Sequence, residues 1–187
     1  FSIANDVKIQ VEFNPAKVAE YRLIGYETRL LNREDFNNDK VDAGEIGAGA
    51  SVTAIYELTP VGSDARLIDA SRYKPQPVSA GNASEFAFLK LRYKTPGADK
   101  SKLVNRPITE KDAVSDISKA PEATRFAASV AAYGEMLRGD PYLDKSFTWD
   151  SLIDLANGAK GKDEFGYRAE FIQLARLAKT AASQQPL

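Results

Sequence analysis

Apolar and polar residues alternate strictly near the start of the chain, between residues 7 and 13. The apolar positions are Val7, Ile9, Val11 and Phe13, and the polar positions between them are Lys8, Gln10 and Glu12. A period of two is typical of a strand that turns one face to a core and the other to solvent. We therefore predict a half-buried strand here, which the turn-forming pair Asn14-Pro15 ends.

Several other segments in the first two thirds of the chain are also typical of strands. They are rich in β-branched and aromatic residues, and they cover Val18–Tyr26, Val52–Leu58, Phe86–Lys94 and Lys102–Ile108. Because proline lacks the amide that a central strand needs, Pro107 places the last of them at an edge or an end of a sheet. A loop rich in Pro, Ser, Gly and Asn is expected over residues 73–84.

The last third of the chain changes to a helical period. A first helix is expected to begin at Ala120-Pro121-Glu122, since proline suits the first helical position, and to stop at Gly139. Its apolar positions, spaced by three or four residues, are Phe126, Val130, Tyr133 and Leu137.

Two further helices follow. Thr148 can cap the second, which closes at Asn157-Gly158, and the third starts near Asp163. The third carries a broad apolar stripe that includes Phe171, Leu174 and Leu177. Because this stripe is wider than a lone surface helix needs, we expect it to pack on the sheet and on the other helices.

The order of these elements predicts the fold class. Strands first and helices afterwards indicate an α+β fold rather than alternating βαβ units. We expect a small antiparallel sheet or partial β-sandwich over residues 1–117, followed by a three-helix segment over residues 118–187 that packs on it as one compact unit. Four or five strands are few for a full sandwich, so the sheet needs a cover. The helices could supply it, or further strands from a longer parent polypeptide of which this chain is a fragment.

Composition narrows the chemistry. The 187 residues include 25 Lys plus Arg, 26 Asp plus Glu, no His and no Cys. Without Cys there are no disulfides, thiolate nucleophiles or Cys-based metal sites, and without His there is no imidazole base. We therefore expect no enzyme and name no catalytic residue, with a carboxylate-based enzyme as a remaining alternative.

Residues 33–49 contain a possible cation loop. Asp35, Asn37 and Asp39 match the first three ligand positions of a calcium loop, where oxygen ligands at alternate residues converge on one cation. The rest of the pattern fails, because Lys40 replaces the glycine of the sharp turn and Ile46 replaces the closing glutamate. We therefore expect a solvated turn and no cofactor, since Asp and Asn favour such connections, with calcium binding as the alternative.

Basic residues are frequent between residues 90 and 111. They are Lys90, Arg92, Lys94, Lys100, Lys102, Arg106 and Lys111. Several of them are the polar positions of an alternating strand, and the chain as a whole is nearly neutral. We therefore expect no nucleic-acid binding. No apolar run is long enough for a membrane helix, so we expect no membrane insertion by this chain.

Two long stretches carry a resemblance to a bacterial family. They are DVKIQVEFNPAKVAEYRLIGYETRLLNREDFNNDKVDAGEIGAGASVTAIYELTP (6–60) and FTWDSLIDLANGAKGKDEFGYRAEFIQLARLAKTA (147–181). The chain resembles the C-terminal domain of unknown function that follows a von Willebrand factor type A domain in bacterial proteins. The resemblance implies that a type A domain of the same parent chain is a partner, and it implies no accepted activity.

These observations favour one function over two others. We expect a non-catalytic accessory or interaction domain that braces or presents the type A domain, or that contacts another protein. A calcium-dependent binding module using Asp35, Asn37 and Asp39 is the first alternative, and the carboxylate-based enzyme is the second. By analogy with the family, we expect the parent protein to be exported, to the periplasm or the cell envelope.

Overall fold

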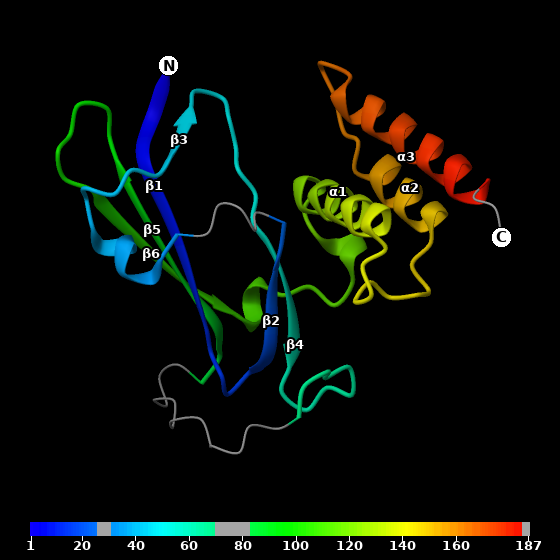
Figure 1. Cartoon of the computed structure of the whole chain (residues 1–187), viewed down its shortest axis with the longest axis horizontal. Helices are drawn as coiled ribbons and strands as arrows, with labels where there is room; N and C mark the ends of the chain where they lie inside the picture. The colour runs from blue at the N-terminus through cyan, green and yellow to red at the C-terminus, as the bar shows by residue number, and fades with distance from the viewer. Residues whose placement is uncertain (26–30, 70–82, 185–187) are drawn as a thin grey trace. The chain divides into compact units, whose positions relative to one another are not determined.

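The computed structural model describes residues 1–25, 31–69 and 83–184 (Figure 1). The chain divides into two compact units, a β unit over Phe1–Ala113 and a helical unit over Val114–Leu187. The β unit contains antiparallel sheets and the helical unit contains three α-helices, which confirms the α+β class. The expected packing of the helices on the sheet, within one compact unit, stays a prediction.

The larger sheet has four antiparallel strands in the order β3-β1-β5-β6. They are β1 (Ser2–Phe13), β3 (Gly44–Gly47), β5 (Glu85–Lys94) and β6 (Lys102–Thr109). The strand that contains Pro107 lies at the edge of the sheet, as predicted. Short 3-10 helices η4 (Glu110–Asp112) and η5 (Ile117–Lys119) follow it.

The smaller sheet has two antiparallel strands, β2 (Val18–Ile24) and β4 (Ile55–Pro60). Its register places Tyr21 opposite Leu58 and Leu23 opposite Tyr56, so these four side chains share one face, including the predicted pair Tyr21 and Leu23. This face meets the larger sheet at Phe13, whose ring centroid lies 4.3 Å from that of Tyr21 and 5.3 Å from that of Tyr56.

Two elements of the segment between β2 and β4 were not predicted. The segment forms a 3-10 helix, η2 (Arg33–Asn37), and then the short strand β3, which pairs with the first half of β1. Strand propensity does not predict β3, because it has glycine at both ends and glycine is depleted in strands. The loop expected over residues 73–84 lies, as far as residue 82, outside the described residues.

The three helices begin and end close to the predicted signals. They are α1 (Glu122–Arg138), α2 (Trp149–Gly158) and α3 (Tyr167–Ser183). Gly139 ends α1 in the left-handed region, and the Thr148 hydroxyl accepts the Ser151 amide at 3.2 Å to cap α2. The Asp163 carboxylate accepts the amides of the first turn of α3, which places that helix a few residues after the predicted start.

The helical unit has an apolar core in which α2 packs against both α1 and α3. Its buried members are Ala132, Leu152, Ile153, Ala156, Ile172 and Ala175, with aromatic rings of α1 and α3 around them. The rings of Phe126 and Tyr133 each meet that of Phe171 edge-on, with centroids 5.4 Å apart. None of the helices within the described ranges is long and apolar enough to cross a bilayer.

The buried faces of α1 and α3 differ in part from the apolar stripes seen in the sequence. Val130 and Leu137 on α1 are exposed, because Ser129 and Ala132 take the buried positions instead. Leu174 and Leu177 lie outside the core of the helical unit, to which α3 contributes Ile172 and Ala175, and their packing on the sheet stays a prediction. Small residues at the contact let the helices approach closely and turn the larger side chains outward.

Candidate functional site

The polar face of β1 contains a buried ion pair. We predicted Lys8 on the solvent side of the strand, but it is only 3% exposed, and Asp6 is only 6% exposed. The prediction was wrong because the segment that contains η2 covers this end of the sheet and supplies polar partners. A charge removed from water in this way must be paired.

The partners of Asp6 are two lysine ammonium groups. Lys8 Nζ lies 3.2 Å from Asp6 Oδ1, and Lys94 Nζ lies 3.0 Å from Asp6 Oδ2. Neither carboxylate oxygen has a hydrogen bond of good geometry, so the attraction is that of an ion pair. Asp6 has a φ of 52° and lies where the pairing of β1 with β5 is irregular, between Asn5 and Lys8. Such a bulge directs the carboxylate toward the lysines.

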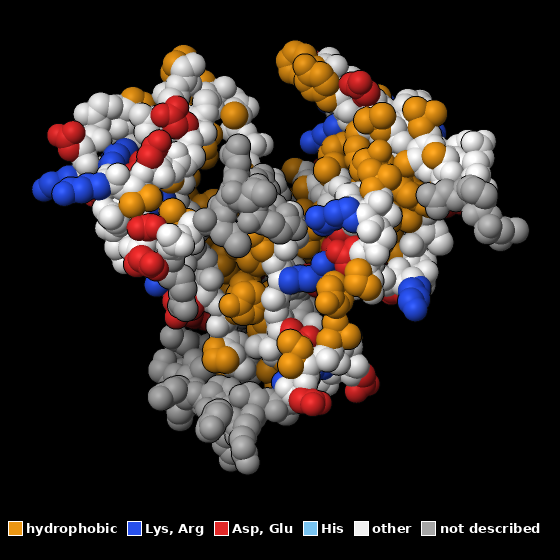
Figure 2. Space-filling model, viewed as in Figure 1, with side chains coloured by type: hydrophobic (Ala, Val, Ile, Leu, Met, Phe, Trp, Pro, Cys, Tyr) orange, Lys and Arg blue, Asp and Glu red, His pale blue; other side chains and the backbone are white. Residues whose placement is uncertain are grey.

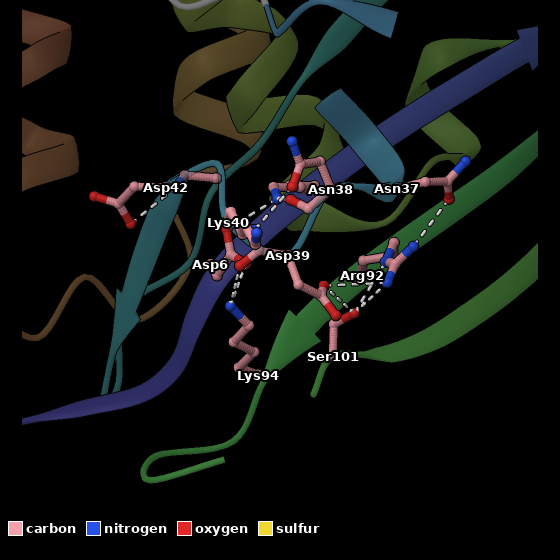
Figure 3. A network of polar contacts seen from close by, with 11 residues as sticks. Asp6, Asn37, Asn38, Asp39, Lys40, Asp42, Arg92, Lys94 and Ser101 are labelled. Atoms are coloured by element: carbon pink, nitrogen blue, oxygen red, sulfur yellow. Dashed lines mark hydrogen bonds and ion pairs between the residues drawn. The ribbon is translucent and has the colours of Figure 1, made fainter. Parts of the chain in front are cut away.

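The same lysines bind the backbone of the neighbouring loop. Lys8 Nζ donates to the carbonyl of Asn38 at 2.6 Å, and Lys94 Nζ donates to the carbonyl of Asp39 at 2.7 Å. Figure 3 shows Lys94 pointing at Asp6 and the loop residues gathered around it. The cations of two strands therefore hold the loop after η2 in place.

Arg92 on β5 completes this network of charges. Its guanidinium donates to Asn37 Oδ1 at 2.9 Å and lies 3.1 Å from Asp39 Oδ1, and both loop side chains turn toward it in Figure 3. Ser101 donates its hydroxyl to Asp39 at 2.7 Å. This hydrogen bond, helped by the charges of Arg92 and Lys94 and opposed by burial, holds the pKa of Asp39 below its ordinary value.

The structure brings together two of the three residues named as calcium ligands. Asn37 and Asp39 share the guanidinium of Arg92, whereas Asp35 accepts a hydrogen bond from the Asn32 amide at 3.0 Å. Protein cations therefore occupy oxygens that the calcium hypothesis would use. No group of three or more acidic side chains able to hold a metal occurs within the described ranges. Calcium binding at this loop stays a prediction, without an observation that favours it.

The basic residues of β5, and Arg106 on β6, lie next to acidic partners. Lys90 lies 3.3 Å from Glu12, and Arg106 lies 2.6 Å from Asp112. Together with the pairing of Arg92 and Lys94 to aspartates, these contacts spread the basic run of residues 90–111 over separate ion pairs. Such a surface differs from the continuous basic groove that tracks a nucleic-acid backbone.

The opposite face of the four-stranded sheet is mainly apolar on β1 and β5, carries Lys102 and Arg106 on β6, and is unevenly covered. Phe13, Ala87 and Ile108 form one row across β1, β5 and β6, and Ala87 is buried there. Ile9, Leu91 and Val104 form a parallel row four residues further along each strand, which we call the open row. Ile9 is 47% exposed and Val104 is 49% exposed. The smaller sheet thus covers the first row and leaves the open row accessible.

The inner face of the smaller sheet is also only partly covered. Tyr56 is partly buried, and this burial raises the pKa of its phenol above the ordinary value, with a further contribution from Tyr21. Tyr21 itself is 62% exposed. The outer face carries Glu20, Arg22 and Glu57, which makes the two-stranded sheet amphipathic.

The helical unit has an apolar surface of its own. Figure 2 shows hydrophobic side chains gathered over this unit, where Leu174 and Leu177 of α3 are exposed. A shallow hollow of about 460 Å³ lies between the end of α1, the start of α2 and the end of α3. Its lining includes Met136, Trp149 and alanines of α3, without a cluster of catalytic side chains.

Comparisons with known proteins agree with these features. The chain is 48% identical over 179 residues to "Uncharacterized protein YfbK" of Escherichia coli (strain K12). The match covers 95% of this chain and 30% of that relative, so the chain spans about a third of the relative's length. No solved structure matches. A family model described as "Uncharacterized protein YfbK, C-terminal" matches residues 1–181, and the chain therefore belongs to this family.

Proposed function

We propose that this chain is a non-catalytic interaction domain of a longer polypeptide. In this proposal its β unit docks on a von Willebrand factor type A domain of the same polypeptide and braces or presents it. The parent protein is exported to the periplasm or the cell envelope, and other proteins bind the type A domain. The match with 30% of the E. coli relative supports a longer parent, because about 70% of that relative lies outside the match.

The observation that carries this proposal is the open row. Ile9, Leu91 and Val104 lie side by side on three strands, and no part of the smaller sheet covers them as it covers Phe13. Large apolar side chains next to each other on a sheet face are costly to leave in water. Such a patch marks an interaction site in a protein that is otherwise soluble.

The polar network has a structural part in this proposal. Asp6, Lys8, Arg92 and Lys94 are engaged with one another and with the loop after η2, on the face opposite the open row. Charges that neutralise each other in this way fix the loop and the bulge of β1. These ion pairs make one face of the sheet rigid. Because the sheet is then already ordered before a partner binds to the other face, little conformational entropy is lost on binding.

Binding to the rest of the parent polypeptide tests this proposal. That remainder, with the type A domain, is produced separately and titrated with this chain by calorimetry. We expect association with a dissociation constant on the order of micromolar. Val104→Glu should weaken it about tenfold or more, because it places a charge in the buried contact.

A matched control is next to Val104 on the same strand. Leu103 is 55% exposed and pairs with Arg92, so its side chain lies on the opposite face. Leu103→Glu should therefore leave the affinity nearly unchanged. The absence of association, or an equal loss with both variants, would contradict the docking proposal.

A further inference from the structure

We infer that the docked element is an extended strand, supplied by the remainder of the polypeptide and added to an edge of the β2–β4 sheet. In that position its apolar side chains cover the open row of Ile9, Leu91 and Val104. This inference rests on the proposed docking function and specifies its mode. The ligand class is a β-strand with apolar residues at every second position, since alternate side chains of a strand point to the same face.

The first argument is the mismatch between the two layers. The larger sheet has four strands, whereas the described part of the second layer has only β2 and β4. Sandwiches pack two apolar faces against each other at about 10 Å. The two strands contact the larger sheet at Phe13, whereas Ile9 and Val104 of the open row, four residues further along their strands, are about half exposed.

The second argument is the state of the β2–β4 sheet itself. An isolated two-stranded sheet is marginally stable in water. Its inner face carries Tyr21, which is mostly exposed, and Leu58, which is partly exposed, although both point toward the interior of the sandwich. An added strand would extend this sheet and bury these side chains together with the open row.

The third argument distinguishes the edges that could accept a strand. The free edge of β6 carries Lys102, Arg106 and Pro107, residue types that discourage pairing. The edge strand β3 is only four residues long. By contrast, β2 and β4 have seven and six residues, and within the described ranges each pairs on one side only. The smaller sheet is therefore the receptive one.

The fourth argument concerns where the strand comes from. About 70% of the E. coli relative lies outside the region that matches this chain. A strand from the same polypeptide acts at a high effective concentration, so it can occupy an edge that free peptides would leave empty. The backbone hydrogen bonds of strand addition supply affinity, and the apolar row supplies the register.

Hydrogen exchange with mass spectrometry tests this inference on the complete 187-residue chain. Exchange of the β2 and β4 amides is measured with the chain alone and with a saturating amount of the separately produced remainder. We expect amides of one of these two strands to exchange about tenfold or more slowly in the complex, because their outer edge becomes hydrogen-bonded.

A pair of tyrosine variants supplies the control. Tyr21→Asp should weaken the association about tenfold or more, because it places a charge on the inner face next to the added strand. Tyr167→Asp changes a tyrosine of similar exposure on α3 and should have little effect.

The outcomes separate this inference from the function on which it rests. Association without new protection in β2 or β4 would overturn strand addition and leave docking intact. Protection of both outer edges in the chain alone would also overturn it, because a segment of this chain would then occupy them. The absence of any association would overturn both.

Discussion

The two units of this chain keep their folds by different means. The helical unit has a compact apolar core around Leu152, which is fully buried. In the described part of the larger β unit, the buried apolar residues are only Val18, Phe36 and Ala87, and the most buried charged pair is Asp6 and Lys8. The smaller unit therefore carries its own core, whereas the larger unit has two apolar sheet faces that meet over part of their area. This difference is the reason that we propose a partner for the β unit rather than for the helical unit.

The largest expected effect concerns the buried charges of the β unit. Lys8→Met leaves the Asp6 carboxylate buried with only one of its two ammonium partners. We expect the free energy of unfolding of the β unit to fall by about 3–5 kcal/mol. The measurement is denaturant unfolding followed by hydrogen exchange in β1 and β5.

A surface ion pair between the same two strands is the control for Lys8→Met. Lys90 pairs with Glu12, and their side chains are 31% and 63% exposed, far more than those of Asp6 and Lys8. Lys90→Met should cost about 0–1 kcal/mol, because water screens the pair. If the two variants lose equal stability, charge pairing does not hold the β unit together.

The matching substitution in the helical unit is Leu152→Ala. Removing this fully buried side chain leaves a cavity next to Ile172, and we expect a loss of about 2–5 kcal/mol. Trp149 is the single tryptophan of the chain, so its fluorescence reports the unfolding of this unit alone. A parallel fall in the protection of β1 and β5 would show that the units unfold together and would weaken the comparison.

The cap of α2 provides a smaller change in the same unit. Thr148→Ala removes the acceptor of the Ser151 amide and should cost about 0.5–2 kcal/mol. Trp149 fluorescence again provides the measurement. Thr148→Asp restores an acceptor at the helix start, so most of the loss should be recovered, and no recovery would contradict the capping role.

Acid stability sharpens the account of the polar network. The pKa of Asp39 is lower in the folded state than its ordinary value of 3.8. Asp39 therefore adds to the free energy of unfolding above pH 3.8, and this contribution is lost as the pH falls through the lowered pKa. Ser101→Ala removes the largest cause of this shift and should raise the pKa of Asp39 toward the ordinary value. Carbon NMR of the carboxyl groups measures this change.

Asp144 is the internal reference in that titration. Its pKa is lowered by hydrogen bonds from Ser146 in the helical unit, which Ser101→Ala does not touch. The titration of Asp144 should stay the same. If the pKa of Asp39 is the same in Ser101→Ala as in the natural chain, Ser101 has no part in the network.

The smallest expected effect is on the open row. Val104→Glu in the isolated chain should change the free energy of unfolding by no more than about 0.5 kcal/mol, because the side chain is half exposed. Urea unfolding measures it. A large loss would mean that the chain itself covers this row, which would remove the main distinction between the two units.

Local sequence signals predicted most of the elements, but neither η2 nor β3, and they did not show which faces are buried. The period of two predicted β1, and the cap and stop residues predicted all three helices, because these signals act within a few residues. The burial of Lys8 was missed, because it depends on the segment after residue 32, which is distant in sequence and has no regular pattern. Hydrophobicity alone does not reveal which side of a helix finds a neighbour, so it did not show that Leu174 and Leu177 lie outside the core of the helical unit.

The candidate site shows the same limit. Asp35, Asn37 and Asp39 were identified by spacing, but spacing does not show which oxygens converge. In the fold, Arg92 and Ser101 reach Asp39 from β5 and the loop after it, far away in sequence. The sequence signal for this network was the series of Lys and Arg residues on β5. When another segment covers such cations, they need acidic or carbonyl partners from that segment.

Cysteine labelling at two neighbouring positions tests the central claim most directly. The natural chain has no cysteine, so V104C and L103C each carry a single thiol on opposite faces of β6. The account predicts that V104C and L103C react at similar rates in the isolated chain, and that V104C alone becomes protected when the remainder of the polypeptide is present. Equal labelling of both thiols in the presence of the remainder would contradict it.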